Sequence, residues 1–346
     1  MSPTNPRTVL AVFRLPALVA LGIAATGCGG GSKQAGTGGG DGKLTVVATT
    51  GMVADLARRV GGDSVRVSQL MGPGVDPHLY KATRDDVAAV LSADLVLYSG
   101  LMLEGKMADT LERAGADRPV IAVTETLPSD RLLSPDDASG HPDPHVWMDA
   151  TLWAECVDAA RTALTQLRPD AADGFQANAD AYVAEITALG DYAERVIATI
   201  PESQRVLVTS HDAFGYFGRA YGLQVEGVQG ISTESEAGLK RVNDLVGMLV
   251  DRGVPAVFVE SSVSPKSVRA LIDGAAAREA EVAIGGELFS DAMGPVDTYE
   301  GTYLGMLDHN VTTVCRALGG EASAGGMAGK LAAAAASDSV EETAAP

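Results

Sequence analysis

The sequence predicts an α/β protein built from two similar units that one long helix joins. Strand and helix signals alternate after residue 42, the alternation restarts after Pro201, and the stretch between lacks strand signals. Such alternation is typical of parallel sheets covered by helices. The strands expected in the first unit are Leu44–Thr50, Val65–Leu70, Leu95–Gly100 and Pro119–Val123. Those expected in the second unit are Arg205–Ser210, Leu223–Gly230, Ala256–Ser262 and Glu281–Gly285.

The stretch from Pro169 to Thr199 is expected to form a single helix. Proline suits the first turn of a helix, and Pro201 ends the pattern. A helix of about 30 residues is about 45 Å long, enough to pass both units as a stiff connector. Apolar residues recur along it at helical spacings, namely Phe175, Tyr182, Ile186, Leu189, Val196 and Ile197.

These signals divide the chain. We expect an N-terminal α/β lobe over 43–168, a connecting helix over 169–200 and a C-terminal α/β lobe over 201–318. The remaining 319–346 is rich in glycine and alanine, and we expect it to be a disordered tail.

The first 27 residues resemble a signal peptide. Arg7 and Arg14 precede an apolar run, Leu15–Thr26, which is too short for the ~20 residues of a membrane span. The run ends before Cys28 in small residues, as in a bacterial lipobox, so Cys28 is expected to carry a lipid, although ordinary cleavage nearby is the alternative. The glycine-rich segment 28–42 would then be a flexible linker holding an extracytoplasmic domain off the membrane.

The net charge of the chain argues against nucleic acid as a partner. Two of the 26 basic residues and none of the 45 acidic residues precede Cys28, which leaves the mature chain a net charge of −21. Such a surface repels nucleic acid and concentrates cations, or serves only solubility. The two other cysteines, Cys156 and Cys315, lie in separate halves of the chain, so buried thiols are expected rather than a disulfide.

Four potential metal ligands lie in four separate loops. His78 follows the second predicted strand of the first unit and His145 follows its fourth. His211 follows the first strand of the second unit and Asp291 its fourth. Open α/β sheets bind ligands beyond the carboxyl ends of their strands, so two facing units would gather these residues in one cleft. Imidazole is the commonest protein ligand for transition metals.

The type of site favours transport of the metal over catalysis. A catalytic zinc usually keeps one position open for water, whereas four protein ligands would fill the sphere. The alternative, a zinc-dependent hydrolase, lacks an HExxH helix or another placed general base. A purely structural metal is disfavoured because two sizeable cores fold without one.

Six ordered segments carry a family resemblance. GPGVDPHLY, DPHVWMD, TSHDAFGYFGRAYGL, VFVESSVSPKSV, LFSDAMG and TYLGMLDHN occur in this order between Lys43 and Leu318. They resemble the manganese- and zinc-binding solute-binding lipoproteins of bacterial ABC importers, the TroA/PsaA-like family. The resemblance implies two α/β lobes bridged by a rigid helix, with a metal site in the cleft between them. It also implies two partners, a membrane permease and its cytoplasmic ATPase.

The resemblance also implies a ligand set. The family's ligands match His78, His145, His211 and Asp291, and histidine at the third position is typical of a three-histidine subgroup. Many zinc-specific members have a long loop rich in histidine before the second ligand, but here that stretch contains only His141. We therefore favour Mn²⁺ as cargo, with Zn²⁺ close behind and Fe²⁺ a further candidate, bound by a monomer without enzyme activity. An adhesin with an incidental metal is another alternative.

Other residues have several interpretations. Glu260 ends a predicted strand and either accepts a hydrogen bond from a ligand histidine or is a plain loop carboxylate. Asp149 is expected to cap the next helix, and Trp147 and Tyr303 to pack in the core. His141 and His309 are expected not to bind metal.

Overall fold

The computed structural model describes residues 42–134 and 140–331. The predicted signal peptide 1–27, the predicted lipidation site Cys28 and the predicted linker up to residue 41 lie outside the described residues, as does the chain from residue 332. The described residues all fall in one compact unit that begins at Gly38. No helix among them is long and apolar enough to cross a membrane.

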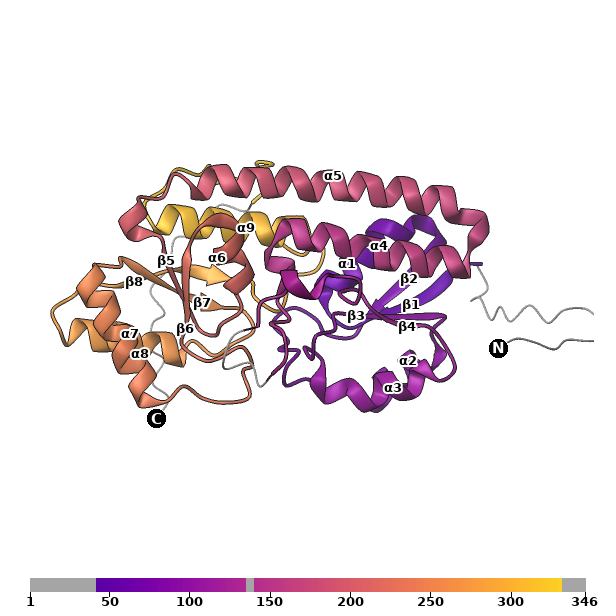
Figure 1. The fold of residues 1–346 in the computed structure, drawn as a ribbon, viewed down its shortest axis with the longest axis horizontal. Helices are drawn as coiled ribbons and strands as arrows, with labels where there is room; N and C mark the ends of the chain where they lie inside the picture. Colours follow the sequence, from indigo (N-terminus) through magenta and orange to yellow (C-terminus); the bar gives the residue numbers. More distant parts are fainter. Residues whose placement is uncertain (1–41, 135–139, 332–346) are drawn as a thin grey trace, which may run out of the picture. The chain divides into compact units, whose positions relative to one another are not determined.

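A four-stranded parallel sheet organises the N-terminal half, and its strand order is β2-β1-β3-β4. Side chains alternate between its two faces: Val46 and Ala48 pack toward α1 and α4, while Val47 packs toward α2 and α3 (Figure 1). Because both faces are covered, the central strands β1 and β3 are mostly apolar. The strands are β1 (Leu44–Ala48), β2 (Val65–Gln69), β3 (Leu95–Tyr98) and β4 (Val120–Ala122). The helices are α1 (Gly51–Gly61), α2 (Arg84–Ser92), α3 (Ala108–Gly115) and α4 (Ala150–Leu167).

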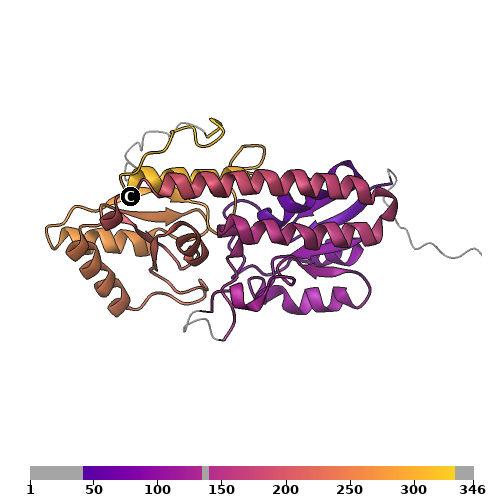
Figure 2. The same ribbon diagram turned by 45° about the horizontal axis from the view of Figure 1, so that its top comes forward.

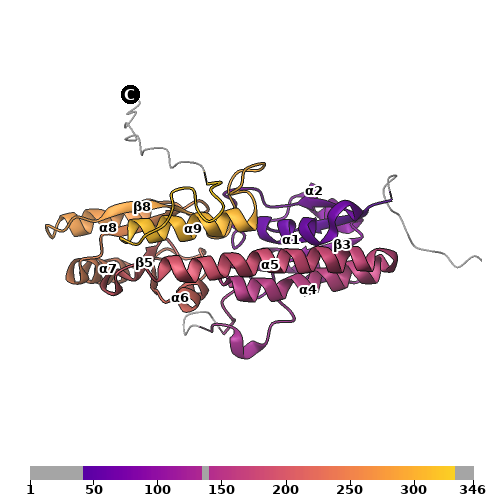
Figure 3. The same ribbon diagram turned by 90° about the horizontal axis from the view of Figure 1, so that it is seen from above.

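The predicted connecting helix is present as α5 (Ala172–Ile197), which follows a short 3-10 turn at Pro169–Ala171. Its 26 residues span about 39 Å. One side of it is buried, including Phe175, Tyr182 and Ile186. It packs against α1 and α4 of the N-terminal half and against α6 and α9 of the C-terminal half (Figures 1 and 3). A single continuous helix therefore supports both halves.

The C-terminal half contains two parallel strand pairs, β5 with β6 and β7 with β8, and β5 lies beside β7. Its strands are shorter than predicted, except β8. Figure 2 shows α9 lying beside α5, which it contacts. The strands are β5 (Val206–Thr209), β6 (Gln224–Gly227), β7 (Ala256–Glu260) and β8 (Ala283–Leu288). The helices are α6 (Gly215–Tyr221), α7 (Leu239–Arg252), α8 (Lys266–Ala276) and α9 (Tyr303–Ala317).

One hydrophobic core extends through both halves. Its buried aromatic side chains come from the N-terminal half (Trp147, Trp153), from α5 (Tyr182) and from the C-terminal half (Phe214, Tyr303). Separating the halves would expose this shared core to water, at a cost of about 25 cal/mol for each Å² of apolar surface. The packing therefore opposes a wide opening of the molecule.

The expectation of a disordered tail from Gly319 is wrong for residues 319–331. Asp308 in α9 accepts hydrogen bonds from the backbone N–H of Met327, and Thr199 Oγ1 accepts one from Glu321 N. Leu331 is buried. The small-residue composition gives no apolar pattern, but acceptors elsewhere in the fold satisfy the backbone of this segment.

Both described cysteines are free and buried, which confirms the expectation of thiols. Asp149 caps α4, as predicted, by accepting from the N–H groups of Thr151 and Leu152. The α/β class, the parallel sheets and the long helix are confirmed as well. The exact lobe boundaries remain a prediction.

Candidate metal centre

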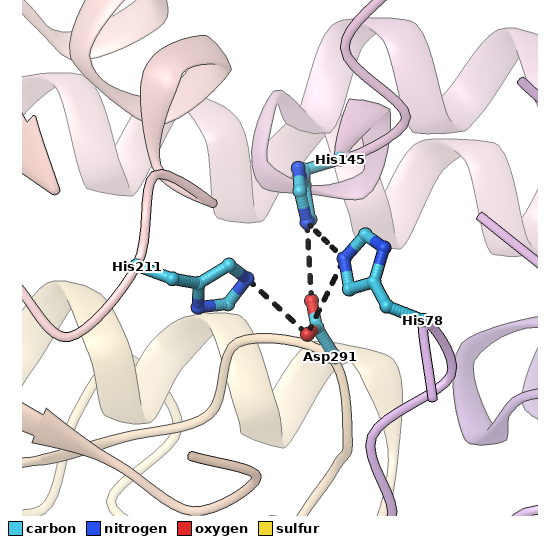
Figure 4. Close-up of side chains that lie close together, drawn as sticks. All are labelled: His78, His145, His211 and Asp291. Atoms are coloured by element: carbon cyan, nitrogen blue, oxygen red, sulfur yellow. Dashed lines mark hydrogen bonds and ion pairs between the residues drawn. The ribbon is translucent and has the colours of Figure 1, made fainter. Parts of the chain in front are cut away.

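The structure brings together the side chains of His78, His145, His211 and Asp291 (Figure 4). One potential ligand atom from each lies within 4.8 Å of the others, and all four residues are buried. His78 and His145 come from loops of the N-terminal half, while His211 follows β5 and Asp291 follows β8. These loops lie beyond carboxyl ends of parallel strands, where α/β folds place their ligand sites.

The ligand atoms of the four residues converge without satisfying one another. The Nε2 atoms of His145 and His211 each lie 3.3 Å from a different oxygen of Asp291, and His78 Nε2 lies 3.8 Å from one of them. His78 Nε2 and His145 Nε2 are 3.3 Å apart. Nevertheless His211 Nε2 and both Asp291 oxygens are buried without a hydrogen-bond partner. Buried polar atoms are nearly always paired, so this cluster fits a bound cation.

A carboxylate fixes the His145 ring from behind. Asp143 Oδ1 accepts from the backbone N–H of His145 at 2.9 Å and lies 2.7 Å from the ring Nδ1. The proton on Nδ1 is thereby held toward Asp143, and Nε2 is the ring atom that faces the centre and would bind a metal once it loses its proton. Partners of this kind set the tautomer and basicity of metal-binding histidines.

Glu260 holds His211 in the same way. This carboxylate is buried at the end of β7, and it accepts from His211 N at 2.8 Å and lies 2.5 Å from its Nδ1. Of the two interpretations of Glu260, the geometry matches the acceptor for a ligand histidine.

His78 is held more loosely. Asp76 Oδ1 accepts from its backbone N–H at 2.8 Å, but within the described residues no carboxylate is hydrogen-bonded to its ring Nδ1. The other Asp76 oxygen accepts instead from Thr233 Oγ1, at 2.5 Å. The His78 ring therefore lacks the support that the other two histidines have.

Electrostatics separate the three imidazoles. Burial lowers the pKa of His78 to about 4. Burial also opposes the charged form of His145, but Asp143 and Asp291 outweigh it and raise the pKa of His145 to about 9. The pKa of His211 is likewise raised well above its usual range, against the effect of burial, by Glu260 and Asp291. Burial disfavours the Asp291 anion, yet His211 and His145 hold the pKa of Asp291 well below its ordinary value.

Trp147 contacts both the His145 ring and the loop that carries Asp291. Its ring lies 5.2 Å from the His145 ring, and its Nε1 donates to Ser290 O at 2.9 Å. Tyr303 Oη donates to Trp147 O, also at 2.9 Å. The sequence predicted only packing for Trp147 and Tyr303; both do pack in the core, but they also carry polar contacts between the halves.

Gly227 permits the backbone of the His211 loop to pass close to β6. A Cβ at this position would lie 2.5 Å from Asp212 N and 2.7 Å from His211 C. These are backbone atoms, so no side-chain rotation relieves the overlap.

The other two described histidines lie outside the centre. His309 in α9 is 2.9 Å from Glu287 O. His141 is exposed in its loop. Asp143 is the supporting residue that the sequence analysis missed, and the repeated Asp-Pro-His tripeptide was the available signal.

Comparison with known proteins identifies relatives along nearly the whole described chain. Residues 46–317 match the family ZnuA, described as zinc-uptake complex component A, periplasmic. The manganese-binding lipoprotein MntA of Bacillus subtilis (strain 168) is 48% identical over 296 residues, 86% of this chain and 95% of MntA. The zinc-binding protein TroA of Treponema pallidum (strain Nichols) is 47% identical over 288 residues, 83% of this chain and 92% of TroA.

Solved structures agree with the sequence matches. The periplasmic zinc-binding protein TroA from Treponema pallidum superposes with a TM-score of 0.78 over 80% of this chain and 99% of that chain, at 47% identity. In sequence, the metal ABC transporter substrate-binding lipoprotein FimA of Streptococcus parasanguinis is a further match, 29% identical over 90% of this chain and 98% of FimA. The chain therefore belongs to the ZnuA family, the metal-binding components that serve the permease and ATPase of ABC importers.

Proposed function

We propose that this protein captures one divalent transition-metal ion through His78, His145, His211 and Asp291 and delivers it to an ABC permease. The observation that supports this proposal most is the set of buried, unpaired ligand atoms on His211 and Asp291. Three neutral imidazoles and one carboxylate suit Mn²⁺, Zn²⁺ and Fe²⁺. Four protein ligands leave little room for a catalytic water, which favours transport over hydrolysis.

Elemental analysis after dialysis tests the capture step. We expect about one equivalent of metal per chain and no hydrolysis of ester, peptide or phosphate substrates. His145→Ala should lose this metal, whereas His309→Ala is the matched control, because it removes a histidine outside the centre. Two equivalents in the wild-type protein, or metal-dependent hydrolysis that copurifies with it, would contradict the proposal.

We propose Mn²⁺ as the physiological cargo, with Zn²⁺ as the principal alternative. MntA, at 48% identity, is a manganese-binding protein and TroA, at 47%, a zinc-binding one. Zinc binds nitrogen and oxygen ligands more tightly than manganese, so affinity in vitro does not identify the cargo. The test is the metal content of protein isolated from its native envelope, together with rescue of a deletion strain by each metal. Rescue by zinc alone would overturn the manganese assignment.

We further propose that a lipid on Cys28 anchors a monomer to the outer face of the membrane. The sequence around Cys28 supports this, and the related MntA is a lipoprotein by name. Cys28→Ala should block labelling by a fatty-acid analogue and release the protein from the membrane fraction. Light scattering of the soluble form should give the mass of one chain.

A further inference from the structure

The four residues of the metal centre differ in their access to solvent. His78 is 6% exposed, whereas His145 and His211 are fully buried and Asp291 is 2% exposed. A cavity of about 500 Å³ reaches the centre, and His78 is the one member of the four that lines it. His78 is also the histidine whose ring has no carboxylate partner on Nδ1 within the described residues. The most accessible ligand is therefore also the least restrained.

Loops from both halves form the wall of this cavity. Leu101, Met102 and Lys106 contribute from the N-terminal half, and Ile231 and Glu234 from the C-terminal half. Two polar contacts join these loops, one between two lining residues and one between Asp76 and Thr233, which flank the lining residues in the chain; we call them the rim contacts.

The first rim contact is an ion pair between Lys106 Nζ and Glu234 Oε1, at 2.5 Å. The second is the hydrogen bond from Thr233 Oγ1 to Asp76 Oδ2, also at 2.5 Å. Asp76 holds the backbone of His78 at the same time. Opening the rim would therefore loosen the turn that carries the exposed ligand.

Other contacts between the halves are buried. Trp147 bonds Ser290 and Tyr303 across the halves. Deeper in the interface, the buried carboxylate of Asp55 in α1 accepts from Tyr182 in α5 and from the N–H of Tyr303 in α9. Breaking these bonds leaves buried polar groups unpaired, which is costly. The Lys106 and Glu234 side chains are 38% and 49% exposed, and an exposed ion pair contributes little to stability. The rim is thus the side that opens at the lower cost.

We propose that the metal ion enters and leaves through this cavity past His78, and that the rim contacts form a gate that sets the rate of exchange. The gate rests on the proposed function, since it needs a metal in the centre. The Lys106–Glu234 pair controls a barrier and not the bound state, because neither residue is a proposed ligand or hydrogen-bonds to one, whereas Thr233 also acts on the bound state through Asp76 and His78. Removing this pair therefore speeds uptake and release by the same factor and leaves the dissociation constant unchanged.

Charge effects on the incoming cation are separable from the gate. Lys106→Gln alone leaves a free carboxylate at the cavity, and Glu234→Gln alone leaves a free ammonium, so steering would change uptake in opposite directions. The double variant Lys106→Gln/Glu234→Gln removes the ion pair without changing net charge. Lys240→Gln/Asp244→Asn is the matched control, because it removes an exposed ion pair of the same length, 2.5 Å, within α7.

Stopped-flow measurements with Zn²⁺ test the gate. Release is followed by transfer to an excess of chelating dye, and uptake by tryptophan fluorescence, since Trp147 adjoins His145. The double variant should exchange metal about two- to fivefold faster in both directions, with the dissociation constant unchanged. Thr233→Val should also speed release but weaken binding, because it frees Asp76, which holds the backbone of His78. The α7 control should keep wild-type rates. Ser232→Trp, an exposed position lining the cavity, should narrow the path and slow both steps.

Two results would overturn the gate. One is wild-type rates when all three substitutions, Lys106→Gln, Glu234→Gln and Thr233→Val, are combined in a protein that still binds one equivalent of Zn²⁺. The other is faster release with unchanged uptake in the Lys106→Gln/Glu234→Gln variant, because the ion pair would then support the bound state. Failure of the proposed function gives a different result, since the wild-type protein would then bind no stoichiometric metal.

Discussion

The two Asp-Pro-His turns share a sequence but treat their histidines differently. In both, the aspartate accepts from the backbone N–H of the histidine two residues later, at 2.8 Å for Asp76 and 2.9 Å for Asp143. Asp143 also contacts the ring of His145, whereas Asp76 turns its second oxygen to Thr233 of the other half. The pKa of His145 is raised to about 9, and that of His78 is lowered, mainly by burial, to about 4.

The difference shows that a local motif determines the backbone turn but not the contacts or the pKa of the histidine ring. The backbone hydrogen bond forms within three residues and is common to both turns. The remaining bonding capacity of each carboxylate is decided by whatever the fold brings near. A carboxylate thereby holds the ring of His145, while none is hydrogen-bonded to the ring of His78 within the described residues.

Asp291 is the anion toward which both turns direct their histidines, so its removal should have the largest effect. Asp291→Ala removes one of the four proposed ligands and leaves two histidines of raised pKa without their shared anion. We expect metal affinity to fall on the order of 1000-fold and the metal-induced rise in Tm to disappear. Competition titration and thermal melts measure this. Asp273→Ala, at an exposed aspartate of α8, should behave as wild type; full metal-induced stabilisation of Asp291→Ala would exclude Asp291 from the site.

Proton release should distinguish the two turns directly. The raised pKa values of His145, about 9, and of His211 favour the charged imidazolium form of both rings in the metal-free protein, whereas the pKa of His78, about 4, favours its neutral form at pH 7. Metal binding must displace about two protons, so affinity should rise about tenfold per proton for each pH unit, up to about pH 9 for His145. Calorimetry in buffers of different ionisation enthalpy counts the protons. Affinity that stays constant from pH 6 to 8 would contradict this assignment.

Replacing the aspartate of each Asp-Pro-His turn by asparagine should lower the metal affinity by different amounts. Asp143→Asn removes the anion beside the His145 ring, and loss of such a partner costs about 10–100-fold in metal affinity. Asp76→Asn should lower metal affinity clearly less, because the only part of His78 that Asp76 contacts is the backbone N–H. Each variant serves as the control for the other in parallel competition titrations. Equal losses would mean that the two carboxylates have the same role.

The smallest effect is expected at the buried contact beside His145. Trp147→Phe removes the bond to Ser290 O but keeps most of the packing, and it should lower the free energy of unfolding by about 1–2 kcal/mol. Trp153→Phe is a close control, because the Trp153 Nε1 is buried without a partner and no hydrogen bond is lost. Chemical denaturation of the metal-free proteins compares them. A Trp153→Phe variant as unstable as Trp147→Phe would assign the effect to packing.

The fold was largely predictable because its signals are local. Alternating strands and helices, and the apolar stripe from Phe175 to Ile197, follow from neighbouring residues. The clustering of the four candidate ligands followed from a general property of parallel strands, since each residue lies beyond a strand's carboxyl end.

The features that were not predictable from the sequence depend on contacts between residues that are far apart in the chain. Trp147 and Ser290 are 143 positions apart, and Asp76 and Thr233 are 157 apart. No local pattern distinguishes the aspartate of one turn from that of the other, so the separate roles of Asp76 and Asp143 were not predictable. The order of residues 319–331 depends likewise on Asp308 and Thr199.

The close approach at Gly227 has a genetic consequence. Because a methyl group there would overlap the main chain of His211 and Asp212, even Gly227→Ala must displace the loop that carries His211. A random-mutagenesis screen for cells starved of the metal should therefore recover alleles at codon 227 beside those at the histidine codons. Such alleles would resemble ligand knockouts, although residue 227 has no side chain and touches no metal.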